Sequence, residues 1–453
     1  MAWSKSWLGG ALGRSLFLHL FLKIDISIRG LHIRRDLNYT MKGIFYDLNT
    51  RKLLLKKMKL GRKYSMIKFR EDWEIPEISH SNQIQVKSRF SGICTSDLHQ
   101  IDVNLPYSAT ILAKKINPFP MGHEVVGEIT QMGNDVEGFE LGDRVVHSPV
   151  AYCEAYGFEL CPSCQRGYHE SCYAIVGVGD GSELEESYGG RGGFGGFSGG
   201  GFSEYFVGFA KQFTKVPDTL PDEIAVLSEP FAVGLHAVAK NPPESSDTAV
   251  VIGAGIIGLM IVASIRHLAP ECRIITLARY PFQAEAARKL GFHEIIIETS
   301  RDEIYNRIAE LTGGILLKPR LGKRILYGNT GPDIIYDSIG TGATLDDALH
   351  LVRSNGRVIA VGMAFSEMRK TDWALQVYKE ISVIGSMMHG METIDGEEVE
   401  SMEKVLEILN KNQSIFEGLV THKYAIDDYK SAFETSSQKG KTGAIKVAFE
   451  FRQ

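Results

Sequence analysis

The N-terminal part of this 453-residue sequence lacks an apolar run long enough to cross a membrane. A spanning helix needs roughly 20 consecutive apolar residues, whereas SLFLHLFL at residues 15–22 is followed closely by Lys23 and Asp25. Without a convincing cleavage site, the run fits a signal h-region, a transit peptide or an extension ahead of the folded chain. We expect no membrane partner and treat residues 1–40 as an N-terminal extension that need not be ordered.

Cysteine is scarce, since the chain has only six. This number is too small for a disulfide scaffold, and CxxC spacing more often indicates metal binding in a reducing compartment. Four of the six lie in CEAYGFELCPSCQRGYHESC at residues 153–172. Alone, they fit extracellular disulfides, a nucleic-acid-binding zinc finger or a zinc-bound loop of an enzyme. Their scarcity favours a reduced, cytoplasmic protein.

An excess of positive charge is also missing, because the formal net charge is −5. The chain as a whole therefore has no general attraction for phosphate backbones, and we expect no nucleic-acid partner. The stretch GGRGGFGGFSGGG at residues 189–201 resembles an RNA-binding tract but contains a single Arg. One cation is too few for such binding, so a flexible inserted loop is the favoured interpretation.

The chain contains two kinds of strand pattern. Residues 41–218 hold short strand-like runs separated by Gly, Asn and Asp, which predict a mostly β domain. Residues 219–384 alternate continuous apolar strands with helices, which predicts an α/β domain with a doubly wound parallel sheet. Residues 385–453 return to mixed structure, with a helix near residues 401–412 and a final strand.

The motif VVIGAGIIG follows a buried strand and opens a helix, as a dinucleotide-binding turn requires. Gly253 permits the tight turn, Gly255 lets a pyrophosphate approach the backbone, and Gly258 lets helix and strand pack closely. The helix then offers free N–H groups at Ile256 and Ile257 to the anion. The motif predicts a Rossmann nucleotide-binding domain.

The end of the next strand discriminates NAD from NADP. An enzyme that uses NAD usually has an acid there for the ribose 2′-hydroxyl. Here the sequence is LARYPF, with Ala278 and Arg279 and no carboxylate. Arg279 can pair with a 2′-phosphate, so NADP is favoured. A solvated Arg279, with the acid supplied from elsewhere, would instead mean NAD.

Two further stretches, SGICTSDLH and MGHEVVGEITQMGNDV, carry Cys94 and His123, both good zinc ligands. Polar residues that can support these ligands follow each of them. They are Ser96, Asp97 and His99 after Cys94, and Glu124 after His123.

With these motifs the chain resembles the zinc-dependent medium-chain dehydrogenase/reductases, a family of alcohol and polyol dehydrogenases. The resemblance extends from Met41 to nearly the C-terminus. It rests on GICTSDLH, the His123 stretch, GDRV at residues 142–145, GGFSEY at residues 200–205, SEPFAVGLHA at residues 228–237 and the glycine motif. It implies a GroES-like catalytic domain joined to the Rossmann domain, with the active site in the cleft between them.

The resemblance also implies residue roles. Cys94 and His123 would bind a catalytic zinc, with Glu124 or Glu229 as the third ligand. Asp97 would orient His123, while Ser96 and His99 would relay the substrate proton to solvent. The reaction would be reversible hydride transfer between an alcohol, polyol or sugar hydroxyl and NADP or NAD. At strand ends beside the expected cofactor path lie Asp337, Gly340 and Gly362, which turn formation alone would also explain.

Related dehydrogenases carry a second, structural zinc in a lobe with CxxCxxC spacing and a fourth Cys seven residues later. Cys161, Cys164 and Cys172 match the last three positions, but Phe158 stands at the first. Cys153 is the favoured replacement and His169 a second candidate, because a longer loop can still close on a tetrahedral ion. The main rival interpretation is a lobe without metal.

Other features depart from the family pattern. Thr95 stands where some alcohol dehydrogenases carry a cation that reaches the pyrophosphate, and residues 316–330 look like an insertion or a long connection. A zinc-free quinone or enone reductase on the same fold is the alternative function, although it would not need Cys94, His123 and a neighbouring acid together. Family members are usually dimers or tetramers, so we expect a homo-oligomer.

Overall fold

The computed structural model describes residues 40–47, 49–58, 60–103, 119–173, 200–292, 294–297, 300–362 and 371–452. The chain separates into two units, Met1–Thr40 and Met41–Gln453, and the second holds the described fold apart from Thr40. The expected extension at residues 1–39 and the glycine-rich stretch at residues 189–199 lie outside the described residues. Among the residues described, no helix is long and apolar enough to cross a membrane.

A seven-stranded, largely antiparallel sheet carries the catalytic candidates. Its order is β19-β20-β3-β5-β6-β8, with β7 also paired to β3. The C-terminal strand β20 lies antiparallel to β3, so the end of the chain joins the strand that precedes Cys94. The strands are β3 (Gln83–Gly92), β5 (Glu124–Met132), β6 (Arg144–His147), β7 (Tyr205–Phe209), β8 (Phe213–Lys215), β19 (Val420–Tyr424) and β20 (Lys446–Glu450).

A six-stranded parallel sheet holds the glycine motif. Its order is β11-β10-β9-β14-β15-β16, so the chain adds β10 and β11 on one side of the first strand, β9, and then β14, β15 and β16 on the other. This is the doubly wound order of dinucleotide-binding domains, so the predicted fold class is confirmed. The strands are β9 (Thr248–Ile252), β10 (Arg273–Ala278), β11 (Glu294–Ile297), β14 (Ile334–Asp337), β15 (Arg357–Ala360) and β16 (Ser382–Gly385).

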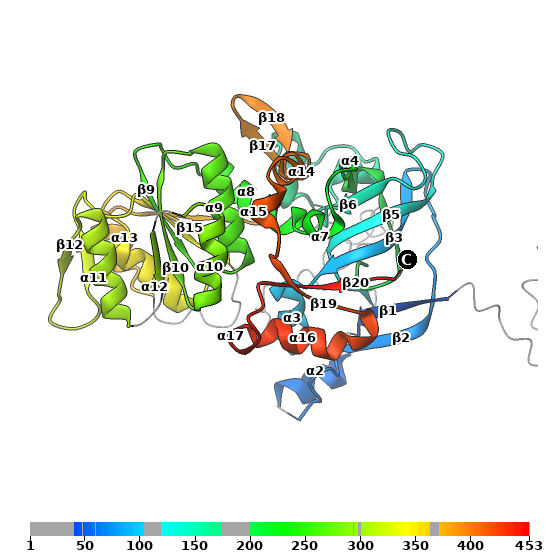
Figure 1. Ribbon diagram of the computed structural model, residues 1–453, viewed down its shortest axis with the longest axis horizontal. Coiled ribbons are helices and arrows are strands. Elements are labelled where there is room, and N and C mark those ends of the chain that lie inside the picture. Colours follow the sequence, from blue (N-terminus) through cyan, green and yellow to red (C-terminus); the bar gives the residue numbers. More distant parts are fainter. Residues whose placement is uncertain are drawn as a thin grey trace, which may run out of the picture. The chain divides into compact units, whose positions relative to one another are not determined.

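Helices cover both faces of the parallel sheet, with α9 and α10 on one side and α11, α12 and α13 on the other (Figure 1). Both faces of β9 are therefore buried, which explains its continuous apolar sequence. Helix α8 packs with α9 and α14 in a core that also takes in Phe90, Val126 and Val146 of the antiparallel sheet. The helices are α8 (Ser228–Ala239), α9 (Ile256–Leu268), α10 (Pro281–Lys289), α11 (Arg301–Thr312), α12 (Gly342–Leu351), α13 (Ala374–Tyr378) and α14 (Ser401–Lys411).

Smaller elements complete the described fold. Residues 316–330, expected to be an insertion or a long connection, form most of the β12–β13 hairpin, and a second hairpin joins β17 to β18. A three-stranded sheet has the order β2-β1-β4. Its strands and the hairpin strands are β1 (Thr40–Tyr46), β2 (Ile67–Glu74), β4 (Phe119–Pro120), β12 (Ile315–Leu317), β13 (Ile325–Tyr327), β17 (Met391–Ile394) and β18 (Glu397–Glu400). The remaining helices are α2 (Thr50–Lys57), α3 (Thr95–Asp102), α4 (Cys153–Tyr156), α7 (Asp222–Ala225), α15 (Gln413–Phe416), α16 (Tyr429–Ser437) and α17 (Lys439–Thr442), with 3₁₀ turns η3 (Cys164–Arg166), η4 (His169–Ser171), η6 (Ala210–Gln212) and η7 (Ile426–Asp428).

Candidate active site

A cleft of about 1420 Å³ is lined both by the predicted zinc ligands and by the glycine motif. Its walls come from the carboxyl ends of the parallel strands, the N-terminus of α3 and the C-terminal helix α17. The predicted residues that line it are Cys94, Ser96, His99, His123, Glu124, Glu229, Gly253, Gly255, Ile256, Ile257, Arg279 and Gly362. Four others, Asp97, Gly258, Asp337 and Gly340, do not line it.

Cys94, His123 and Glu124 form a compact group, with one ligand atom of each lying within 4.8 Å of the others. Strand pairing explains this proximity, because Gly92 of β3 lies opposite Glu124 of β5. A Cβ atom at Gly92 would lie 2.0 Å from the Glu124 carboxylate. Gly92, the first residue of the GICTSDLH motif, therefore leaves room for an acid, a role that the sequence alone did not indicate.

Asp97 connects the two ends of this group from a buried position in the first turn of α3. Its Oδ2 accepts a 2.9 Å hydrogen bond from the backbone N–H of Cys94. Its Oδ1 lies 3.7 Å from Nδ1 of His123, too far for a hydrogen bond but close for two charges. Burial raises the pKa of Asp97 to about 6, although the His123 charge opposes the shift. The arrangement fits a group that orients the His123 ring.

The charge of His123 is governed by its neighbours. Burial lowers the pKa of the ring, but Asp97, Cys94 and Glu229 more than reverse this effect and hold the pKa well above its ordinary value. The acids and the cysteine around the ring favour a positive charge at this position. A bound cation in place of the ring proton would satisfy the same set of groups.

Lys446 is a neighbour of the site that the sequence did not reveal. Its Nζ lies 2.6 Å from Oε1 of Glu124, and both side chains are almost completely buried. The ammonium also donates to the Ile93 carbonyl oxygen at 3.3 Å. Burial lowers the pKa of Lys446, but Glu124 and Cys94 raise it by more, so the lysine remains charged. One signal was available, namely a lysine within the apolar final strand.

The second candidate acid, Glu229, is in a different state. It lies in the first turn of α8, is buried, and lines the cleft. Burial raises its pKa to about 7, and the Glu124 charge adds to this effect while His123 opposes it. The site thus holds two carboxyl groups in different states. The charge of Glu124 is balanced by Lys446, whereas burial disfavours ionisation of Glu229.

The glycine motif forms a tight turn followed by a closely packed helix. Gly253 has a φ of +98°, and a Cβ there would lie 2.7 Å from Ser338 Oγ. A Cβ at Gly258 would lie 1.9 Å from the Gly253 carbonyl oxygen, so close helix packing needs this glycine. At Gly255 a Cβ would meet no atom within 4 Å. The motif therefore leaves open space at the N-terminus of α9.

The remaining cofactor candidates divide into two groups. Arg279 directly follows β10, is exposed, and lines the cleft. Asp337 is fully buried instead, and its Oδ1 accepts 3.0 Å hydrogen bonds from the N–H groups of Ile339 and Gly340. Gly362 lies so close to Ile339 that a Cβ would be 2.3 Å from its backbone. Asp337, Gly340 and Gly362 shape the turn that forms the cleft wall.

The four cysteines of residues 153–172 also meet, since their sulfur atoms lie within 4.8 Å of one another. All four are free thiols, and the Cys153 and Cys172 sulfurs are 3.6 Å apart. Cys153 begins the short helix α4, whose left-handed end at Gly157 turns the seven-residue spacer back toward Cys161. Burial raises the pKa of Cys161, but hydrogen bonds with Tyr173, Cys164 and Cys153 lower it overall.

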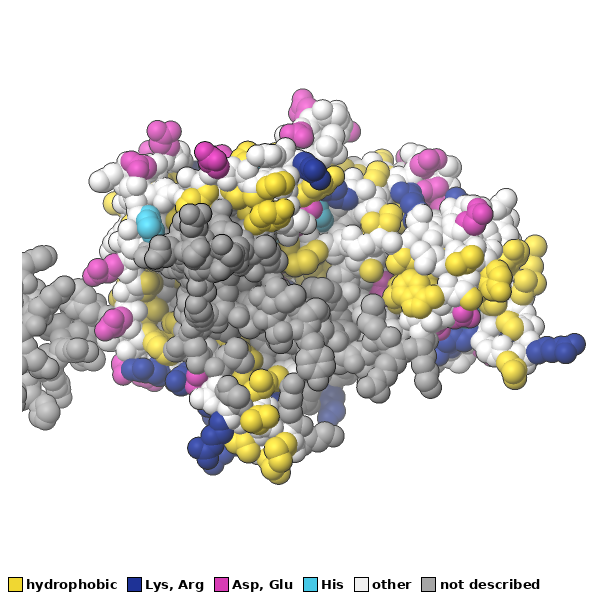
Figure 2. Space-filling view, turned by 180° about the vertical axis from the view of Figure 1, so that it is seen from behind, with side chains coloured by type: hydrophobic (Ala, Val, Ile, Leu, Met, Phe, Trp, Pro, Cys, Tyr) yellow, Lys and Arg dark blue, Asp and Glu magenta, His cyan; other side chains and the backbone are white. Residues whose placement is uncertain are grey.

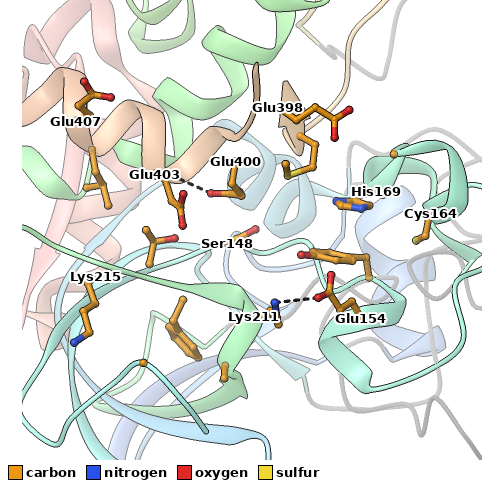
Figure 3. A pocket seen from close by; sticks show the side chains of 18 of the residues that line it. Ser148, Glu154, Cys164, His169, Lys211, Lys215, Glu398, Glu400, Glu403 and Glu407 are labelled. Atoms are coloured by element: carbon orange, nitrogen blue, oxygen red, sulfur yellow. Dashed lines mark hydrogen bonds and ion pairs between the residues drawn. The ribbon is translucent and has the colours of Figure 1, made fainter. Parts of the chain in front are cut away.

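His169, the other candidate for the fourth corner, is not part of the cysteine group. Its ring stacks on Tyr152 with centroids 4.0 Å apart. Both rings line a separate hollow of about 1640 Å³ between the lobe and α14, where Glu398, Glu400, Glu403 and Glu407 gather (Figure 3). Neither the glycine motif nor the Cys94 group lines this hollow.

Comparisons with known proteins agree with the geometry. The family model for the alcohol dehydrogenase GroES-like domain matches residues 80–218, and that for the zinc-binding dehydrogenase domain matches residues 257–410. A sorbitol dehydrogenase from Halalkalibacterium halodurans is 26% identical over 81% of this chain and 91% of its own length. An L-threonine 3-dehydrogenase from Paraburkholderia phymatum is 28% identical over 81% and 92%.

A solved structure shares the fold. The crystal structure of 2R,3R-butanediol dehydrogenase from Bacillus subtilis superimposes with a TM-score of 0.64 and 24% identity, covering 90% of this chain and 99% of that one. The first match covers five of the seven strands of the antiparallel sheet, with Cys94, His123 and Glu124, and the second covers five of the six strands of the parallel sheet. The chain belongs to the zinc-dependent medium-chain dehydrogenase family.

Proposed function

We propose that the protein reversibly oxidises a secondary hydroxyl of an alcohol, polyol or sugar, with NADP favoured over NAD. The observation that carries this proposal is the Cys94, His123 and Glu124 group in the same cleft as the glycine turn. Sorbitol, L-threonine and 2,3-butanediol, after which the relatives are named, each carry a secondary hydroxyl beside another polar group. A substrate of this type is the best-supported class.

Cys94 and His123, with Glu124 or Glu229, would hold the catalytic zinc. The donor set of sulfur, nitrogen and carboxylate oxygen suits Zn²⁺, whose tetrahedral ligands at roughly 2.0–2.3 Å lie roughly 3.3–3.8 Å from one another. The ligand atoms of Cys94, His123 and Glu124 already lie within 4.8 Å of one another, so small side-chain movements would bring them to this spacing. When bound, zinc acts as a Lewis acid that lowers the pKa of the substrate hydroxyl.

The surrounding side chains would position these groups and move the proton. Asp97 holds His123 and the Cys94 backbone, while Lys446 balances the charge of Glu124. Ser96 and His99 lie on one helix at the cleft wall, where they would accept the substrate proton and pass it to solvent. Burial lowers the pKa of His99, which leaves the ring ready to accept a proton.

The nicotinamide cofactor would bind along the parallel sheet, with its pyrophosphate in the open space at Gly255. Arg279 would pair with the 2′-phosphate of NADP. Lys439 of α17 also lines the cleft, and its electrostatic neighbours include Cys94 and Glu124. It would supply the cation that is missing at Thr95.

The cysteine group would hold the second, structural zinc through Cys153, Cys161, Cys164 and Cys172. The 3.6 Å distance between the Cys153 and Cys172 sulfurs agrees with ligands on one tetrahedral ion at roughly 2.3 Å. A longer spacer before Cys161 would thus replace the usual first ligand at Phe158.

The test combines metal analysis with activity measurements. We expect two zinc ions per chain, and oxidation of some members of a panel of alcohols, polyols and aldoses with NADP or NAD. Cys94→Ser should lose one zinc and nearly all activity. Full activity in this variant, or quinone and enone reduction by a protein without zinc, would refute the proposal.

A further inference from the structure

The segment at residues 50–63, TRKLLLKKMKLGRK, differs from the rest of the chain. It contains seven Lys and Arg residues and no acid, although the whole chain has a net charge of −5. It connects β1 to β2 and includes helix α2. The segment also precedes residue 80, where the match to the GroES-like family model begins. Its charge therefore belongs to a part of the chain outside the matched dehydrogenase domains.

Apolar side chains on this segment face solvent. Leu54 is 57% exposed, Met58 65% and Leu60 68%, and Leu55 is also exposed. Helix α2 projects from the sheet that contains β1 and β2 (Figure 1). In the space-filling view, hydrophobic and basic side chains lie together on this protrusion (Figure 2). We call these four apolar residues, with Arg51, Lys52, Lys56, Arg62 and Lys63, the basic protrusion.

Ion pairs hold the protrusion on the fold and leave part of its charge available. Lys56 lies 3.3 Å from Asp102, and Lys63 lies 3.0 Å from Glu434. Lys52 similarly pairs with the buried Asp47. Arg51 and Arg62 are exposed and have no ion pair among the described residues. In the sequence, the four exposed apolar residues thus lie between two exposed arginines, Arg51 and Arg62.

We propose that the basic protrusion docks the protein onto an anionic lipid surface. Interleaved leucine and cationic side chains suit a bilayer interface, where apolar groups enter the acyl boundary and cations contact acidic headgroups. A nucleic acid would instead favour aromatic side chains for stacking, but Tyr64 beside the segment is half-buried and donates a hydrogen bond to the Lys430 carbonyl oxygen. This contact needs no membrane-spanning helix, although the sequence led us to expect no membrane partner.

The experiment measures binding of the full-length protein to phosphatidylcholine vesicles with and without phosphatidylserine, by co-sedimentation at low and high salt. We expect binding that requires phosphatidylserine and weakens in high salt. The variant Leu60→Ser/Arg62→Glu should bind at least tenfold more weakly, because it removes apolar contact and reverses one charge. Its thermal unfolding should match that of the wild type, since both side chains are exposed.

The matched control is Leu321→Ser/Arg320→Glu in the β12–β13 hairpin, where Leu321 is 90% exposed and Arg320 is exposed. This control should bind like the wild type, and an equal loss would refute the assignment to the basic protrusion. Absence of wild-type binding to phosphatidylserine vesicles would also refute the proposal. Equal binding to polyglutamate, unaffected by Leu60→Ser alone, would indicate an acidic macromolecule as the partner instead of a lipid surface.

Discussion

The substitution Lys446→Met tests whether the buried pair with Glu124 contributes to stability and limits access to the metal site. The two side chains are 2% and 1% exposed, and their charged atoms lie 2.6 Å apart. Removing one member of such a pair leaves an unpaired buried charge and costs about 3–5 kcal/mol. We expect the free energy of unfolding in the presence of a chelator to fall by this amount.

Zinc should reverse much of this loss, because Glu124 without its lysine is free to act as a ligand. Urea unfolding followed by intrinsic fluorescence, with chelator and with zinc, gives both values. The control is Lys423→Met on the neighbouring strand β19, which breaks the exposed 2.8 Å pair between Lys423 and Glu223 of α7. It should cost at most about 1 kcal/mol. A similar small loss for Lys446→Met in chelator would show that the pair is neither buried nor tightly coupled.

Four further predictions concern metal, cofactor and pH. Cys153→Ser should reduce bound zinc from two ions to one and lower the thermal stability. The control Cys272→Ser, outside the lobe, should keep both ions. Unchanged zinc content in Cys153→Ser would exclude Cys153 as a ligand. Arg279→Asp should shift the NADP-over-NAD ratio of kcat/KM at least tenfold toward NAD, and an unchanged ratio would refute the role of Arg279 at the 2′-phosphate. Lys439→Met should raise KM for both cofactors, and an unchanged KM for either cofactor would contradict a contact between Lys439 and the pyrophosphate. Burial raises the pKa of Glu229 to about 7 in the folded protein. Between about pH 4.5 and 7 the folded protein therefore retains a proton that the unfolded chain has lost, and the protein in chelator should lose stability as pH rises through this range. Glu229→Gln should remove this part of the pH dependence in urea unfolding, and an identical profile would contradict the raised pKa.

Much of the fold could be predicted because local patterns determine it. Continuous apolar strands between amphipathic helices can be buried only in a parallel sheet covered on both faces, as β9 shows. Gly253 needs a positive φ and Gly258 packs against the Gly253 carbonyl oxygen, so local steric requirements explain two of the three glycines and indicate the turn. Cys94 and His123 each stand at an end of a strand-like run, and β3 pairs with β5 as such runs suggest.

Interactions between distant residues could not be predicted in this way. The contact between Lys446 and Glu124 joins positions 322 residues apart, and no periodicity in the sequence connects them. The sequence likewise did not separate the turn-forming role of Asp337 from cofactor contact, because both place an acid at a strand end. Its fully buried side chain, bonded to the backbone of its own turn, is visible only in three dimensions.

The choice between Glu124 and Glu229 as third ligand shows why such contacts matter for function. The family resemblance offers both acids as ligands, and only Glu124 directly follows His123 in the sequence. In the fold, however, Lys446 binds both oxygens of Glu124, so ligation by Glu124 must break a buried ion pair. Glu229 pays a different cost, since burial opposes its ionisation until a cation is present. We expect the balance of these two costs to decide which acid binds zinc, and Lys446, which is distant from Cys94 and His123 in the sequence, to set the cost for Glu124.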